Sequence, residues 1–207
     1  MNLLNRPWNV VFFVGYLAYF WIRGVYAHRT KRESKIHREV DWLEKALLLL
    51  VISSALVLPM LYLFSPWLRF ADYRLPAWAG PCGVVVMLLA LWMFWRSHAD
   101  LGQNWSVTLE VREGHQLVTR GVYRSIRHPM YASIFLWGIA QALLLPNWLA
   151  GWSGFVPFLV MYVLRMPREE RMMCAFFGQA YRDYMARTGR LFPRIRKEGD
   201  KGDGQSC

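Results

Sequence analysis

Two short polar motifs stand at the ends of a long stretch without charged side chains. The first, Arg-His-Pro-Met-Tyr, occupies residues 127–131, and the second, Arg-Met-Pro-Arg-Glu-Glu, occupies residues 165–170. From residue 130 to residue 164 the chain carries no charge and is interrupted only by Pro146 and Asn147. This pattern predicts an apolar hairpin with both motifs on one side. Because ionisable groups at a membrane boundary indicate function, we expect a site where the motifs meet.

Each motif contains groups that could hold an ionic ligand. Proline fits the first turn of a helix, so we expect Pro129 to open a helix with His128 near its cap. The N–H groups and the positive dipole of that turn attract a carboxylate. In the second motif Arg165 and Glu169 share a helix face, whereas Glu170 is turned about 100° away. A plain helix start and an interfacial ion pair are the alternative interpretations.

The loop before the first motif is suited to contact a ligand through its backbone. Residues 101–106 form a polar turn that contains a glycine, and residues 107–111 alternate weakly like a short strand. Residues 115–123 follow before the first motif. A solvated connecting loop is the alternative interpretation of this region.

Metal and nucleophile chemistry are disfavoured by spacing. No two histidines are three or four residues apart, so no helix face presents two imidazoles to a metal ion. Ser153 lies in Gly-Trp-Ser-Gly, which lacks the spacing of a nucleophile elbow. We therefore expect a site without a metal ion and without a catalytic triad.

Composition and apolar segments predict an integral membrane protein. The chain has 207 residues, of which 55% are hydrophobic, too many for an ordinary soluble domain of this size. A bilayer crossing needs roughly 20 apolar residues. The segments expected to cross are 8–22, 46–64, 77–95, 130–145 and 148–164. The last two are short, so a re-entrant pair is the alternative for them, and a cleaved signal peptide is the alternative for the first.

The distribution of positive charge predicts the orientation of these segments. Arginine and lysine gather in residues 23–45, 96–128 and 165–207, whereas the connections between them carry few charges or none. Positive loops stay in the cytoplasm, so we expect an outside N-terminus and cytoplasmic loops and C-terminus. The net charge of +11 then follows mainly from topology, with attraction to anionic membrane lipids as a secondary effect. No nucleic-acid partner is expected.

These observations divide the chain into three parts. Residues 1–95 hold three membrane helices, residues 96–193 hold the loop, the hairpin and the C-terminal helix of the expected site, and residues 194–207 form a basic tail of disordered composition. A C-terminal amphipathic helix is expected over residues 168–187, with its apolar side packed on the hairpin. The expected fold class is an all-α integral membrane protein with about five transmembrane helices, the last two forming a short hairpin.

The motifs of the second half occur in an order that resembles a known family. The pattern is Leu101-Gly102-x-Asn104-Trp105-Ser106, His115-x-Leu117-Val118-Thr119-x-Gly121-x-Tyr123, Arg127-His128-Pro129-x-Tyr131, the hairpin, Glu169-Glu170, Phe177-Gly178-x-x-Tyr181-x-x-Tyr184 and Phe192-Pro193. It resembles the isoprenylcysteine carboxyl methyltransferase family, within the wider group of membrane methyltransferases that includes phospholipid N-methyltransferases. The resemblance covers residues 101–193. One departure is Ala132-Ser133, where many relatives have a glycine.

The resemblance implies a cytoplasmic pocket for S-adenosyl-L-methionine and a lipophilic or prenylated substrate that enters from the bilayer. It implies catalytic roles for Arg165, Glu169 and His128, with Arg165 facing the substrate. The residues expected at the cofactor are His115, Gln116, Leu117, Val118, Gly121, Tyr123, His128, Pro129, Met130, Tyr131, Glu169 and Glu170.

The chemistry of methyl transfer agrees with these residues. A sulfonium methyl donor is already activated, so transfer needs positioning and desolvation more than a strong acid or base. A carboxylate acceptor needs no base and is oriented by an arginine such as Arg165. Three alternatives remain open at this point: a lipid amine N-methyltransferase, a nicotinamide-dependent sterol-type reductase of similar topology, and a catalytically silent membrane scaffold.

Overall fold

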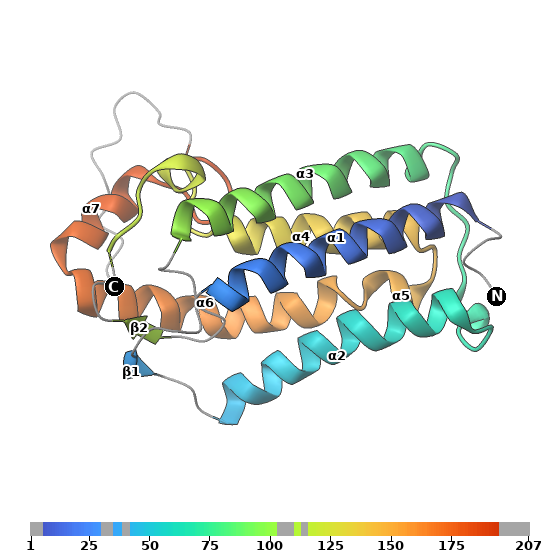
Figure 1. The fold of residues 1–207 in the computed structure, drawn as a ribbon, viewed down its shortest axis with the longest axis horizontal. Helices are drawn as coiled ribbons and strands as arrows, with labels where there is room; N and C mark the ends of the chain where they lie inside the picture. The colour runs from blue at the N-terminus through green and yellow to red at the C-terminus, as the bar shows by residue number, and fades with distance from the viewer. Residues whose placement is uncertain (1–5, 30–34, 39–41, 103–109, 113–115, 195–207) are drawn as a thin grey trace.

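The computed structural model describes residues 6–29, 35–38, 42–102, 110–112 and 116–194. Long helices that run alternately in opposite directions dominate this part of the chain (Figure 1). Their bounds are Pro7–Arg29 for α1, Trp42–Phe64 for α2, Ala79–Leu101 for α3, Pro129–Leu144 for α4 and Phe155–Phe177 for α6.

Shorter elements connect these helices. The strands β1 (Lys35–Arg38) and β2 (Glu110–Arg112) pair antiparallel, which adds a small two-stranded sheet to the helical fold. The sequence suggested a weak strand over residues 107–111, most of which lie outside the described residues. The remaining elements are η1 (Arg69–Ala71), η3 (Gly121–Arg124), α5 (Trp148–Trp152) and α7 (Gln179–Arg187).

The alternating course brings the polar connections to one end of the molecule. Helices α1, α3 and α6 finish at the end drawn on the left of Figure 1, where α2 and α4 begin. We call this the polar end, and the other the opposite end. The short strands, η3 and α7 all lie at the polar end (Figure 1). The two charged motifs therefore share one end of the bundle.

The predicted helical membrane architecture is confirmed. Within the described residues, α1, α2, α3 and the stretch Trp148–Phe177 are long and apolar enough to cross a membrane, and α4 is a shorter apolar helix. Large apolar side chains such as Val14, Trp21, Leu49 and Val163 are exposed on the outer faces of these helices. Apolar outward faces suit contact with lipid tails. The protein is an integral membrane protein.

The helix boundaries differ from the sequence prediction at the second half of the hairpin. A separate short helix, α5, precedes α6, and α6 continues through Pro167 to Phe177. The helix expected over residues 168–187 is therefore two elements, because Gly178 adopts a φ of +56° between α6 and α7. Glycine adopts this left-handed conformation without steric strain, so the chain turns there.

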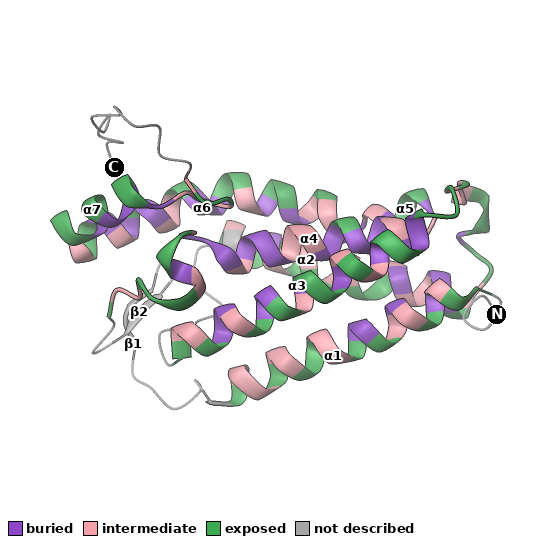
Figure 2. Ribbon diagram, turned by 90° about the horizontal axis from the view of Figure 1, so that it is seen from above, coloured by how far each residue is buried: buried purple, intermediate pink, exposed green. Residues whose placement is uncertain are grey.

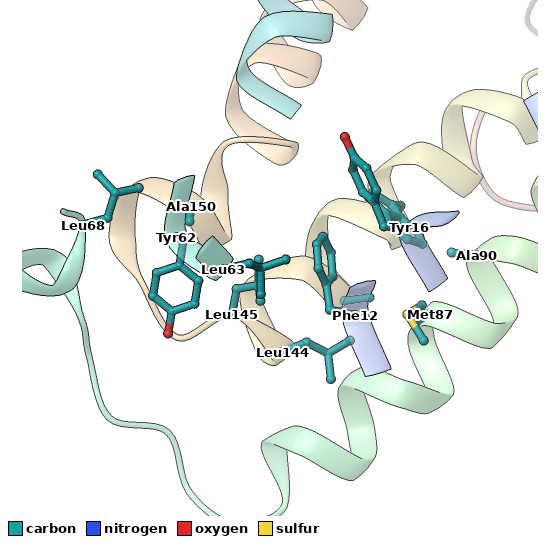
Figure 3. Close-up of a cluster of buried hydrophobic side chains, with 12 residues drawn as sticks. Phe12, Tyr16, Tyr62, Leu63, Leu68, Met87, Ala90, Leu144, Leu145 and Ala150 are labelled. Atoms are coloured by element: carbon teal, nitrogen blue, oxygen red, sulfur yellow. The ribbon is translucent and has the colours of Figure 1, made fainter. Parts of the chain in front are cut away.

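A hydrophobic core joins α1, α2, α3 and α4. Its members include Phe12, Leu63 and Leu144, and Figure 3 shows these side chains converging from different helices. Buried positions follow α4 and the facing side of α3 (Figure 2). Gly83 allows close approach here, since a Cβ atom at this position would lie 2.9 Å from Leu144 Cγ. The close packing fixes the direction of α4 and thus the place of its polar end.

Asn147 anchors the hairpin at the opposite end. Its side chain is fully buried, and its Oδ1 accepts hydrogen bonds from the N–H groups of Leu149 (3.1 Å) and Ala150 (2.9 Å), so it caps α5. Its Nδ2 donates to Leu68 O (2.6 Å) and to Asp72 Oδ1 (2.9 Å). The turn between α4 and α5 is therefore tied to the connection between α2 and α3.

Candidate functional site

The two charged motifs meet at the polar end, where the start of α4 lies beside the last turns of α6. His128 precedes α4 and Pro129 is its first residue, as expected from proline at a helix start. Glu169 and Glu170 lie on α6, about 40 residues later in the chain. His128 Nε2 is 3.3 Å from Glu170 Oε1, and His128 Nδ1 is 3.7 Å from Glu169 Oε1. One imidazole therefore stands between two carboxylates.

Glu170 is surrounded by cationic partners. Its side chain is only 7% exposed, and its Oε1 accepts from Arg127 Nε at 3.1 Å. Its Oε2 accepts two hydrogen bonds from Arg190, from Nε at 3.1 Å and from NH2 at 2.9 Å. With His128 this makes three donor side chains on one carboxylate. We call Arg127, His128, Glu170 and Arg190 the buried ion cluster, after its buried carboxylate; the Arg190 side chain itself is 48% exposed.

Arg127 also holds the end of α7. Its NH1 donates to Met185 O at 2.9 Å and to the carbonyl oxygen of Thr188. The last carbonyl groups of a helix have no partner within the helix, and a cation next to them is favourable. The backbone continues the connection, since the N–H groups of Arg127 and His128 donate to Gly189 O (2.8 Å) and Arg190 O (3.0 Å). The first motif is therefore attached to the chain segment after α7.

Glu169 has a more open environment than Glu170. Its side chain is 27% exposed, and its Oε2 accepts a hydrogen bond from the Tyr131 hydroxyl. Arg165 Nε lies 3.8 Å from the same oxygen, as the shared helix face predicts. The Tyr131 ring stacks on the His128 imidazole with centroids 5.5 Å apart. We call Tyr131, Arg165 and Glu169 the open carboxylate face, after the partly exposed Glu169; Tyr131 and Arg165 are themselves buried.

The loop before α4 packs against both α3 and α7. Leu117 is partly buried against a cluster that contains Cys174 and Tyr181. Tyr123 is buried, its hydroxyl lies 3.5 Å from Ser97 O, and its carbonyl accepts from Tyr184 Oη at 2.6 Å. Burial raises the pKa of Tyr123 well above its ordinary value, so this phenol stays protonated and can donate.

The structure brings most of the expected site residues to the polar end. Gln116 and Gly121 are exposed, Val118 and Met130 are partly buried, and Pro129 is buried at the start of α4. His115 and the tail over residues 195–207 lie outside the described residues, as do residues 103–106 of the polar turn.

Sequence reasoning missed two members of the buried ion cluster. Arg127 was part of the quoted motif but had no site role assigned. Arg190 had no signal at all, because its partner Glu170 is 20 residues away and on another element. In the described part of the chain, no group of His, Cys, Asp and Glu side chains is arranged to hold a metal ion.

The class defined by these observations is a helical membrane protein with an ionic site at one end of its spans. Comparison with known proteins supports a particular family. The model of the isoprenylcysteine carboxyl methyltransferase (ICMT) family matches residues 83–175. This range contains both charged motifs and all of α4.

Curated relatives of the chain carry the same family name. The protein-S-isoprenylcysteine O-methyltransferase of Tribolium castaneum is 31% identical over 140 residues, which are 63% of this chain and 50% of the relative. The protein of that name in Homo sapiens is 28% identical over 64% of this chain and 50% of the relative. Protein-S-isoprenylcysteine O-methyltransferase B of Arabidopsis thaliana is 25% identical over 65% and 69%. The chain spans about half the length of the insect and human relatives.

A solved structure shares the fold. The eukaryotic intramembrane Ras methyltransferase ICMT superposes with a TM-score of 0.53 and 28% identity, covering 76% of this chain and 55% of the other. The resemblance to the isoprenylcysteine carboxyl methyltransferase family predicted from the motifs is thereby confirmed in sequence and in fold.

Proposed function

We propose that this chain is a membrane methyltransferase that uses S-adenosyl-L-methionine and methylates the carboxylate of an isoprenylcysteine or a similar lipophilic molecule. The observation that carries the proposal is the open carboxylate face. It places a partly exposed anion, Glu169, beside a buried cation, Arg165, at the end of the membrane spans. The family resemblance of residues 83–175 supports the same activity.

The residues at this face fit the charges of the donor. Its amino acid part has an ammonium, which Glu169 would hold, and a carboxylate, which suits the first turn of α4. Within the described residues, His128 at the N-cap of α4 makes no side-chain capping bond to that turn. Gln116, Leu117, Val118 and the unplaced His115 would line the nucleoside, with Gly121 and Tyr123 completing the loop. Glu170 would act indirectly, since its oxygens already accept from three side chains.

The chain's own residues would position the acceptor and keep water away. When bound, the donor supplies an electrophilic methyl group on a sulfonium. Arg165 would orient the acceptor carboxylate so that one oxygen points at that methyl carbon. Because a carboxylate is ionised at neutral pH, neither His128 nor Glu169 has to remove a proton.

An apolar cluster next to the open carboxylate face suits the lipid part of the acceptor. Tyr131 belongs to a cluster with Leu47, Phe158, Met161 and Met166, drawn from α2, α4 and α6. Apolar and aromatic side chains of this kind favour a hydrocarbon chain over water. An acceptor with an ionic head and a prenyl tail would match the open carboxylate face and the apolar cluster beside it.

We propose that the polar end faces the cytoplasm. The basic segments of the chain follow α1, α3 and α6, which all finish at that end. Retention of positive loops in the cytoplasm supports this orientation. Single cysteines introduced into segment 65–78 or segment 195–207 can be treated in intact cells with a membrane-impermeant thiol reagent. The orientation predicts that only the cysteine in segment 65–78 is labelled. Labelling of the second segment by an impermeant reagent would contradict it.

The activity can be tested with a labelled methyl donor and a matched pair of acceptors. The purified protein in lipid nanodiscs is expected to methylate an S-farnesylated cysteine derivative with a free carboxylate, but not its carboxamide. Substitution Arg165→Met should raise KM for the acceptor by about tenfold or more and leave the affinity for S-adenosylhomocysteine within a few fold. Methylation of the carboxamide, or no turnover of the free acid, would contradict the proposal.

A lipid amine is the second candidate acceptor. An amine must lose a proton on methylation, and the partly exposed carboxylate of Glu169 is placed to receive one. Mass analysis of the products from total membrane lipids separates an ester from an N-methylated lipid. Titration with S-adenosylhomocysteine and, separately, with NADPH distinguishes both methyltransferases from a sterol-type reductase.

A further inference from the structure

Asp100, in the last turns of α3, binds the backbone of the loop that precedes α4. Its Oδ2 accepts a hydrogen bond from Val122 N at 2.9 Å, across 22 residues of sequence. Its Oδ1 accepts from Arg96 NH2, one turn earlier on α3, also at 2.9 Å. The Asp100 side chain is 12% exposed, so this carboxylate is largely removed from water. A carboxylate with this little exposure needs its donors, and here one of them is a main-chain N–H.

The 3-10 helix η3 depends on this contact because it lacks a cap of its own. In the described residues, its N-cap Arg120 makes no side-chain hydrogen bond to the N–H groups of the first turn. Free N–H groups at the start of a helical turn require an acceptor, which an N-cap Asp or Ser commonly supplies. Asp100 supplies that acceptor from a different helix. It acts as a distant cap that fixes η3 on α3.

Gly121 makes room for this cap. Its φ is +60°, and a Cβ atom there would lie 2.0 Å from Asp100 Oδ2, far inside van der Waals contact. Any other residue would both strain the backbone and displace the Asp100 carboxylate. The requirement for glycine at position 121 therefore follows from the contact with Asp100, independently of any contact with a ligand.

The position of η3 also determines the position of residues at the candidate site. Tyr123 follows Val122 directly and is held between Ser97 O on α3 and Tyr184 Oη on α7. Two residues later, Ser125 O accepts from Gly189 N at 3.2 Å, and Arg127 then enters the buried ion cluster. A shift of η3 would therefore move the loop that connects α3 to α4.

We propose that Asp100 is a positioning residue, which holds residues 116–123 in the arrangement that binds the methyl donor. This inference rests on the proposed function, since it assigns the loop to the donor. It predicts that loss of the Asp100 carboxylate weakens donor binding and leaves the acceptor's KM unchanged. A general loss of structure would instead affect both.

The test compares three variants in nanodiscs by titration with S-adenosylhomocysteine and by kinetics. Asp100→Ala should weaken S-adenosylhomocysteine binding by about tenfold or more, because a charge-assisted hydrogen bond to the loop is lost. Asp100→Asn keeps an oxygen that can accept from Val122 N and should stay within about threefold of the wild type. Arg96→Ala is the matched control, because it removes the other partner of Asp100 and leaves the cap in place.

Hydrogen exchange gives a second reading that needs no ligand. The amide of Val122 should exchange at least about tenfold faster in Asp100→Ala than in the wild type or in Arg96→Ala. Unchanged exchange, or unchanged S-adenosylhomocysteine affinity in Asp100→Ala, would overturn the inference. If the wild type itself failed to bind S-adenosylhomocysteine, the proposed function would fall, whereas the exchange result would still report on the cap.

Discussion

Glu169 and Glu170 are neighbours in the chain, yet the structure gives them opposite surroundings. Glu170 belongs to the buried ion cluster and accepts hydrogen bonds from two arginines and a histidine. Glu169 lies on the open carboxylate face, partly exposed, with Tyr131 and Arg165 beside it. A buried carboxylate that accepts from several side chains stabilises the fold. A partly exposed carboxylate with fewer partners can bind a ligand. The two neighbouring carboxylates therefore differ, with Glu170 enclosed in an ion cluster and Glu169 at the candidate binding site.

The difference follows from helix geometry. Adjacent residues on a helix point about 100° apart, so Glu169 reaches Tyr131 in α4, whereas Glu170 reaches Arg127 before α4 and Arg190 after α7. His128 lies between them and contacts both. The buried ion cluster therefore orients the imidazole that borders the open carboxylate face.

The largest expected effect is the loss of stability in Glu170→Ala. Removal of this carboxylate leaves the guanidinium of Arg127, whose side chain is 2% exposed, without its anion. Loss of one partner from a buried ion pair costs about 3–5 kcal/mol. Thermal unfolding in detergent should show a much lower midpoint for Glu170→Ala than for the matched Glu169→Ala. Equal midpoints would mean that the two carboxylates do not differ as described.

The next effect is the loss of donor binding in Glu169→Gln. This change keeps the size of the side chain and removes the charge that would pair with the donor's ammonium. A hydrogen bond to a charged group contributes about 1.5–3 kcal/mol, so affinity for S-adenosylhomocysteine should fall by about 10- to 100-fold. The unfolding midpoint should stay near that of the wild type. Wild-type affinity in this variant would remove Glu169 from the donor site.

A smaller effect is expected from Asn147→Ala, at the opposite end. The change removes the cap of α5 and the bonds to Leu68 and Asp72. Loss of such a cap lowers stability by about 1–2 kcal/mol. Because the site lies at the other end of the hairpin, titration with S-adenosylhomocysteine should give an unchanged affinity. A large loss of affinity would show that the two ends are coupled.

The smallest effect is expected from Tyr131→Phe. This variant removes one hydroxyl that donates to Glu169 and keeps the ring that stacks on His128. A single hydrogen bond of this kind contributes about 1 kcal/mol, so binding of S-adenosylhomocysteine should weaken by about fivefold. Stability should barely change, as judged by the unfolding midpoint. An effect as large as that of Glu169→Gln would indicate that the hydroxyl itself contacts the ligand.

Local patterns explain why part of the site was predictable. Pro129 at a helix start and the spacing of Arg165 and Glu169 depend only on neighbouring residues, and the structure shows both features. The break at Gly178 was not anticipated, because an isolated glycine in an amphipathic pattern is compatible with a continuous helix. The hydrogen bond between Asp100 and Val122 was equally hidden, since nothing near Asp100 in the chain points to it.

The sequence by itself determined the membrane helices, the concentration of positive charge at one end and the family that the chain resembles, because these depend on composition and short-range order. Only the tertiary structure decided which carboxylate is enclosed. Arg127 and Arg190 reach Glu170 across 43 and 20 residues, so the direction of packing of α4, α6 and α7 sets the partner of each charge. A pattern of residue types contains no such distances, and the identity of an ion pair depends on them.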